Sequence, residues 1–139
     1  MRNSSKTHGV FSWNELITTD LESAKEFYGT LLGWTFTETQ TIYGHTYLVA
    51  HKDDIVVGGM MLKGGNVPAH ITPCWDPYIS VEDVEISARQ VKDLGGKVVL
   101  PPTEIPGIGR FCVIMDAQGV SLNLISYVKD DNEKRKEPV

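Results

Sequence analysis

Acidic side chains on two predicted strands are the residues of this chain best suited to do chemistry. In the segment 10–18 (VFSWNELIT), alternation places Trp13 and Glu15 on one face of a strand. Asp76 lies in a second predicted strand, at about 75–81. A buried carboxylate with a raised pKa can act as a general base, and its oxygens can also hold a divalent ion. Glu15 is therefore the candidate catalytic residue.

Histidine and cysteine supply no metal-binding motif. Cys74 and Cys112 are far apart and match no metal spacing, so we expect two free thiols in a reducing, cytoplasmic compartment. The histidines fall in an N-terminal arm, a strand, a strand end and a linker, where surface or loop positions are expected. They are His8, His45, His51 and His70.

Composition excludes two classes of partner. The 139 residues carry a formal net charge of −5, which argues against nucleic acid. No apolar run approaches the roughly 20 residues of a membrane helix, and the N-terminal segment lacks the apolar core of a signal peptide. The length predicts one domain.

The elements that carry these residues are predicted to occur twice. The repeated segments are TTDLE (18–22) with LLGWTF (31–36), and VEDVE (81–85) with DLGGKV (93–98). Asp20 or Thr19 is predicted to cap the first helix and Gly33 to end it, and Asp83 is predicted to open the second helix. A repeated unit of this size buries too little surface to be stable alone. We therefore expect function where two units meet.

Each unit is predicted to have the order β-α-β-β-β. The expected domain covers residues 10–127, built from units 10–62 and 75–127 with a Gly- and Pro-rich linker at 63–74. Flanking segments are predicted to be a loose arm (1–9) and a charged, disordered tail (128–139). In the second unit, a strand at 97–101 is expected to end where PPTEIPGIG begins, because proline disfavours regular structure.

Three segments give a family resemblance. DLESAKEFYGTLLGW (20–34) is similar to the first-helix signature of the vicinal oxygen chelate superfamily, which includes glyoxalase I, extradiol dioxygenases and bleomycin-resistance proteins. LGGKVVLPPTEIPGIGRF (94–111) and DAQG (116–119) resemble a glyoxalase-like subgroup often labelled as hydroxylases. The resemblance implies an α+β fold, in which two βαβββ repeats form paired curved sheets around a shared cavity with helices outside.

The resemblance also implies where a metal would be held. Members that use a divalent ion place ligands on the first and last strands of each unit. Alignment of the two repeats assigns these positions to Trp13, Gly58, Asp76 and Asn123. Indole and glycine offer no donor, so we predict no resident metal or other cofactor. Glu15 with Asp76 and Asn123 could still hold a weak ion.

Alternation along the same strands predicts which side chains line the cavity in place of metal ligands. Val56 and Met60 are expected to share the inner face with Gly58, and Tyr47 is added from the third strand. The predicted pocket residues are Trp13, Glu15, Tyr47, Met60, Asp76, Tyr78 and Asn123. This set combines aromatic walls with a few polar groups, as is usual for a small-molecule pocket. Trp13, Met60 and Tyr47 could equally serve as ordinary packing in a small barrel, whereas the carboxylates of Glu15 and Asp76 would each need a partner, a ligand or water.

Two functions remain open at this point. One is a metal-independent protein that binds a small organic molecule, like the drug-sequestering resistance proteins. The alternative is a lyase, isomerase or dioxygenase with a remodelled site, in which Glu15 acts as the base. The units could close on each other within one chain or exchange between two chains as a homodimer.

Overall fold

Two compact units make up the chain. A computed structural model describes residues 6–64 and 72–128. The N-terminal unit spans residues 13–77, and the C-terminal unit combines residues 78–139 with 1–12. Most of the predicted linker and nearly all of the predicted tail lie outside the described residues.

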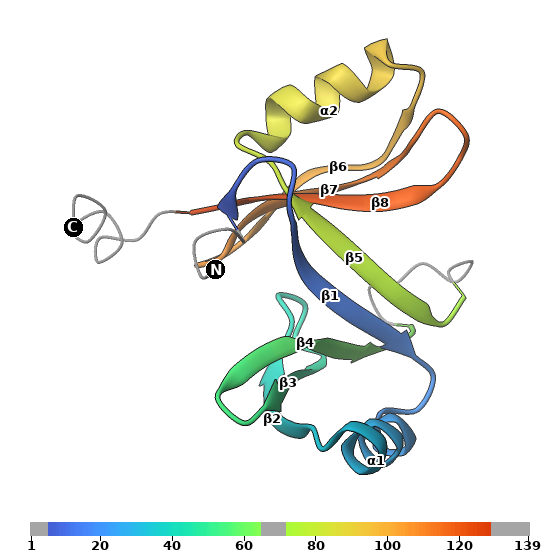
Figure 1. Cartoon of the computed structure of the whole chain (residues 1–139). Coiled ribbons are helices and arrows are strands. Elements are labelled where there is room, and N and C mark those ends of the chain that lie inside the picture. The colour runs from blue at the N-terminus through green and yellow to red at the C-terminus, as the bar shows by residue number, and fades with distance from the viewer. Residues whose placement is uncertain (1–5, 65–71, 129–139) are drawn as a thin grey trace, which may run out of the picture. The chain divides into compact units, whose positions relative to one another are not determined.

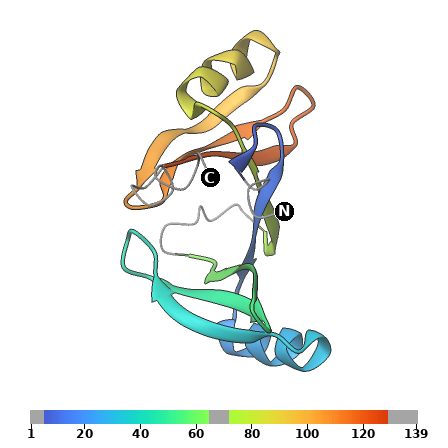
Figure 2. The ribbon, with the colours of Figure 1, turned by 60° about the vertical axis from the view of Figure 1, so that its left-hand side comes forward.

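The N-terminal unit has one helix and mainly antiparallel strands. Its elements are β1 (Phe11–Thr18), α1 (Leu21–Leu32), β2 (Thr35–Gln40), β3 (Thr46–Lys52) and β4 (Ile55–Leu62). The strands follow the order β2-β3-β4-β1, and β1 runs parallel to β4. Helix α1 lies against one face of this sheet (Figures 1 and 2). First and last strands are thus hydrogen-bonded neighbours.

The C-terminal unit repeats this plan. The elements of the second repeat are β5 (Cys74–Ser80), α2 (Val84–Asp93), β6 (Lys97–Ile105), β7 (Gly109–Met115) and β8 (Ser121–Tyr127). The first part of β5, up to Pro77, belongs to the N-terminal unit. The order is β5-β8-β7-β6, with β5 parallel to β8 and α2 over one face (Figure 1). The predicted α+β class with two βαβββ repeats is confirmed. Neither helix in the described part of the chain has the length and apolar character needed to span a bilayer.

Of the two candidate caps of α1, the structure uses Asp20 and not Thr19, and the prediction that Asp83 opens α2 is confirmed. The Asp20 carboxylate accepts a hydrogen bond from the Ser23 backbone N–H at 3.0 Å, and Asp83 accepts from two N–H groups at the start of α2. Gly33 ends α1 with φ of 75°, a conformation that glycine adopts at little cost. The repeated Asp and Gly positions therefore fix both ends of α1 and the start of α2.

Each unit buries its own core between helix and sheet. In the N-terminal unit, Leu16, Leu48 and Met60 pack with Ala24 of α1. The core of the C-terminal unit consists of Val81, Val84, Ala88, Val91, Cys112, Ile114 and Leu124. Burial raises the pKa of the Cys112 thiol to about 11, because a thiolate would be poorly solvated there. Cys112 therefore behaves as a small apolar core residue.

The prediction that a strand ends at residue 101 is wrong. Strand β6 continues to Ile105 through Pro101 and Pro102. It lies at the end of the strand order and pairs only with β7, with register shifts between Val98 and Leu100 and between Leu100 and Thr103. An edge strand with bulges tolerates proline, because the missing N–H would not have been needed in the ladder.

Part of the segment predicted to be a loose arm is hydrogen-bonded to the end of β5 and the residues after it. The Gly9 N–H donates to the Ser80 carbonyl at 2.7 Å, and the Ser80 N–H donates to the Val10 carbonyl at 2.9 Å. His8 Nδ1 accepts a hydrogen bond from the Glu82 N–H at 2.9 Å. This stretch is part of the C-terminal unit, next to the end of β5.

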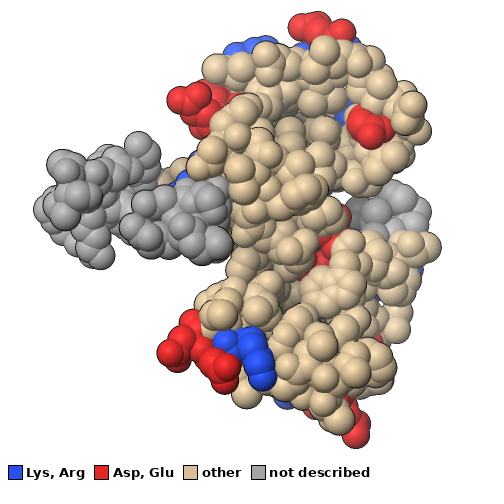
Figure 3. Space-filling view, in the orientation of Figure 1, with Lys and Arg blue, Asp and Glu red and all other residues tan. Residues whose placement is uncertain are grey.

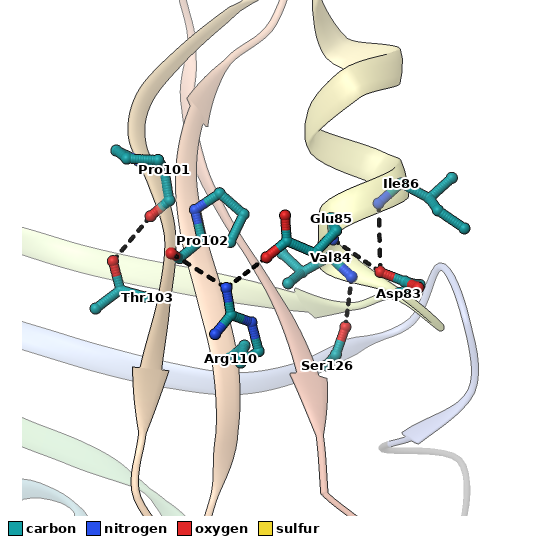
Figure 4. Close-up of polar contacts among 9 residues, drawn as sticks. All are labelled: Asp83, Val84, Glu85, Ile86, Pro101, Pro102, Thr103, Arg110 and Ser126. Carbon is teal, nitrogen blue, oxygen red and sulfur yellow. Dashed lines mark hydrogen bonds and ion pairs between the residues drawn. The ribbon is translucent and has the colours of Figure 1, made fainter.

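Two contacts join α2 to the sheet beneath it (Figure 4). The Ser126 hydroxyl accepts a hydrogen bond from the Val84 N–H at 2.7 Å, which satisfies a backbone donor at the buried start of the helix. Arg110 forms an ion pair with Glu85 and lies 3.5 Å from the Pro102 carbonyl oxygen. Both partners of the ion pair are about half exposed, so water screens it.

We expect Ser126→Ala to lower the free energy of unfolding by about 1–2 kcal/mol, because it leaves the Val84 N–H without an acceptor. Arg110→Gln should cost less than about 1 kcal/mol, as is usual for exposed ion pairs. Urea denaturation of the two single variants measures both. A larger loss for Arg110→Gln would contradict this ranking.

Candidate functional site

Three side chains of the N-terminal unit form a hydrogen-bonded series on the sheet face opposite α1. The Trp13 indole N–H donates to the Tyr47 hydroxyl at 2.8 Å, and that hydroxyl donates to Glu15 Oε1, also at 2.8 Å. Glu15 is 8% exposed. A nearly buried carboxylate is costly unless hydrogen-bonded, so Tyr47 stabilises Glu15 at this position.

Gly59 makes room for this series. In the parallel pair β1–β4, Glu15 lies opposite Gly59. A Cβ atom built on Gly59 would lie 1.9 Å from the Tyr47 hydroxyl oxygen and 2.3 Å from its ring carbon Cζ. The phenol of Tyr47 thus occupies the space that a side chain at position 59 would need. The Gly58-Gly59 pair was the available sequence signal, because glycine in a strand often marks a close approach.

The prediction of which alternate residues face each side of the sheet is confirmed for β1 and wrong for β4. Leu16 and Met60 pack against α1, so Met60 faces away from Glu15 and Tyr47. The residue that contacts Tyr47 is its neighbour, Met61. Val57 causes the error: it is an extra residue at a bulge, where Ala50 pairs with Gly58 but His51 pairs with Val56.

The pairing of β1 with β4 shows that the predicted ligand position on the last strand of the N-terminal unit is off by one residue. Tyr78 lies opposite Asn123 in the C-terminal unit, as Glu15 lies opposite Gly59 in the N-terminal unit. Gly59, not Gly58, is therefore the repeat counterpart of Asn123. Gly58 lies against the Asn14 carbonyl, where a Cβ would be 2.6 Å from the oxygen.

The remaining predicted site residues lie on β5 and β8. Tyr78 and Asn123 are buried on the face opposite α2, since their neighbours Ile79 and Leu124 pack beneath that helix. Asp76 is half-buried on β5 within the N-terminal unit. Each of these three polar residues has an interaction partner.

Electrostatic effects around these strands are modest. The pKa of the Cys74 thiol is raised, mainly by burial and further by the nearby Asp76 carboxylate. The hydroxyl groups of Tyr127 and Ser12 share a hydrogen bond at 2.9 Å, and burial raises the pKa of Tyr127.

On the face drawn in Figure 3, Lys and Arg side chains are few and lie close to acidic ones. That face therefore presents no continuous basic surface.

The residues at the expected ligand positions of the N-terminal unit do not fit a metal ion. Trp13 and Gly59 have no donor for a cation, and the ring of Tyr47 fills the intervening space. Among residues 6–64 and 72–128, no three His, Cys, Asp or Glu side chains group closely enough to hold an ion. What the arrangement offers is an aromatic surface beside an oriented carboxylate.

Comparison with known proteins identifies the family. The profile of the Glyoxalase/Bleomycin resistance protein/Dioxygenase superfamily matches residues 10–124. The chain belongs to this superfamily. The match covers both βαβββ repeats, from the start of β1 into β8.

Curated relatives within the superfamily are longer than this chain. "Putative glyoxylase CFP32" of Mycobacterium tuberculosis is 34% identical over 120 residues, which covers 84% of this chain and 44% of that protein. "Anthracycline biosynthesis protein DnrV" of Streptomyces peucetius is 24% identical over 124 residues, covering 81% and 45% respectively. The chain thus spans less than half the length of these relatives.

Solved structures share the fold. Methylmalonyl-CoA epimerase from Mycobacterium tuberculosis matches with a TM-score of 0.61 at 16% identity, over 88% of this chain and 92% of that one. A hypothetical protein from Bacillus halodurans matches with a TM-score of 0.64 at 12% identity, over 89% and 96%. At these identities the likeness concerns architecture alone.

We expect Gly59→Ala to lower the free energy of unfolding by about 1–3 kcal/mol, because the added methyl group displaces the Tyr47 ring. In a Tyr47→Ala background the same substitution should cost much less, since the space is then open. Chemical denaturation of the four proteins in this double-mutant cycle measures the coupling. Equal costs in both backgrounds would show that Tyr47 does not occupy this space.

Proposed function

We propose that this chain is a small-molecule-binding member of the superfamily that works without a resident metal ion. The ligand binds at the face that carries Trp13, Tyr47 and Glu15. The observation that carries the proposal is the Tyr47 phenol over Gly59, hydrogen-bonded on one side to indole and on the other to carboxylate. A site organised in this way binds through stacking and hydrogen bonds rather than through Lewis-acid coordination.

The chemistry of the face favours a planar ligand with cationic or hydroxyl groups. The flat indole of Trp13 suits stacking, and the carboxylates of Glu15 and Asp76 accept hydrogen bonds and attract positive charge. The relative named for anthracycline biosynthesis supports this choice, because anthracyclines are planar, hydroxylated aromatic compounds. We therefore propose that the ligand is a basic or polyhydroxylated aromatic compound, which the site binds more tightly than an anionic thioester.

A second candidate function is proton abstraction by Glu15, as in an isomerase or lyase. The observation that favours it is a carboxylate only 8% exposed and oriented by the Tyr47 hydroxyl. Such a group can accept a proton from a bound substrate if the acidic C–H lies within reach. Exchange of a bound ligand's C–H for deuterium in D2O, lost in Glu15→Gln, would support this function over simple binding.

Protein purified without chelators should contain far less than one equivalent of zinc, nickel, iron or manganese. Elemental analysis by mass spectrometry measures this, with Asp76→Ala and Asn123→Ala as matched variants. Near-stoichiometric metal that a chelator removes, and that Asp76→Ala loses, would contradict metal-independent binding.

A thermal-shift screen of planar cationic, neutral and anionic compounds should give hits that are mainly cationic or polyhydroxylated. Trp13→Ala should weaken their binding by about 1–3 kcal/mol, because the ligand loses a large apolar contact. Calorimetric titration of wild type, Trp13→Ala and Trp13→Phe measures the loss, with Trp13→Phe retaining part of the stacking. Hits that are mainly anionic, or that bind Trp13→Ala equally well, would overturn the proposed ligand class.

A further inference from the structure

Three aromatic side chains cluster on the α1 side of the N-terminal unit. Tyr28 of α1 stacks on Trp34, with ring centroids 5.5 Å apart and planes inclined by 18°. Trp75, at the start of β5, stands nearly perpendicular to both, at 5.5 Å from Tyr28 and 6.0 Å from Trp34. The Trp75 indole N–H donates to the Tyr28 hydroxyl at 3.1 Å, which fixes its orientation.

An open hollow lies beside this cluster. It has a volume of about 270 Å³ and is lined by Asn14, Val57, Trp34 and Trp75. Asn14 neighbours Trp13 and Glu15 on β1, so alternation places it on the opposite face of the strand. Trp75 remains 39% exposed. We call this feature the aromatic hollow, and it is separate from the face that carries Glu15.

The surroundings of Trp34 contain carboxylates and two lysines. The same indole also lines a second hollow of about 490 Å³ along α1, together with Asp20, Glu22, Glu26 and Lys25. Lys25 lies 3.8 Å from Glu22, so Asp20 and Glu26 have no basic partner among the residues that the structure describes. The Lys52 ammonium also lies beside Gly33, the neighbour of Trp34, so the local excess of negative charge is small.

We propose that the aromatic hollow binds a small organic cation of the quaternary ammonium class. Two indoles whose planes are inclined by 88° both line this space, and tryptophan is the side chain that attracts such cations most strongly. A methylated ammonium group is weakly hydrated and too large for a tight ion pair. The indole rings that line the aromatic hollow therefore suit it better than a single carboxylate would. Asp20 and Glu26 line the neighbouring hollow along α1, which shares Trp34 with the aromatic hollow.

Choline and its neutral isostere 3,3-dimethylbutan-1-ol are the probes that test this proposal. They have nearly the same shape and differ in charge. The chain contains three tryptophans, so the indole N–H signals of Trp34 and Trp75 can be followed by NMR with Trp13 as internal reference. Choline should shift the Trp34 and Trp75 signals saturably and leave Trp13 unmoved. The neutral isostere should bind at least about fivefold more weakly.

Matched variants locate the site. Trp75→Leu should weaken choline binding by about fivefold or more, and Trp75→Phe by less, because a smaller ring remains. Glu26→Gln and added salt should each weaken it by about twofold. Trp13→Phe should bind choline as wild type does, which separates this site from the one under "Proposed function". Circular dichroism confirms that each variant is folded.

Three results would overturn the proposal. Equal affinity for the neutral isostere would show an apolar hollow without cation recognition. Unchanged choline affinity in both Trp75 variants would place binding elsewhere. No saturable shift of the Trp34 and Trp75 signals up to about 100 mM choline would show that the hollow binds no such cation.

Discussion

The constraint on which the N-terminal unit depends is the close contact between the Tyr47 ring and the backbone at Gly59. Only glycine leaves space for the phenol above β4. From there its hydroxyl reaches both the Trp13 indole and the Glu15 carboxylate. A side chain at position 59 would displace the ring, and Glu15 would lose a partner that supports its burial. One missing Cβ atom thus organises the polar chemistry of this face.

The two repeats use equivalent positions differently. In the C-terminal unit, the last-strand residue that pairs with Tyr78 of the first strand is Asn123, whose side chain is a buried amide. The equivalent last-strand residue of the N-terminal unit, which pairs with Glu15, is Gly59. The backbone plan is retained while the polar groups come from another strand, β3. Superfamily membership therefore establishes the architecture, and the chemistry has to be derived from each unit's own side chains.

Much of the fold could be predicted because its signals are local. The capping aspartates, Asp20 and Asp83, act within a few residues, and alternation in β1 follows from the pleat. Simple alternation assigns Gly58 and Met60 to the wrong face, because the bulge at Val57 shifts every later residue of β4 by one position. That bulge is set by pairing with β3, which no local pattern records. The same holds for Pro101 and Pro102, whose tolerance depends on β6 being an edge strand.

The parallel pairing of the first and last strands of each unit has a consequence for how the chain folds as it is synthesised. The pairing of Glu15 with Gly59 can form only after Gly59 has been synthesised, and the pairing of Tyr78 with Asn123 only after Asn123 has been synthesised. Contacts that join residues so far apart in sequence close late and make folding slow compared with a helical bundle. Until β4 or β8 leaves the ribosome, the first strand of that unit exposes an unpaired edge. Nascent chains of this architecture therefore have two successive intervals in which they are prone to associate with one another.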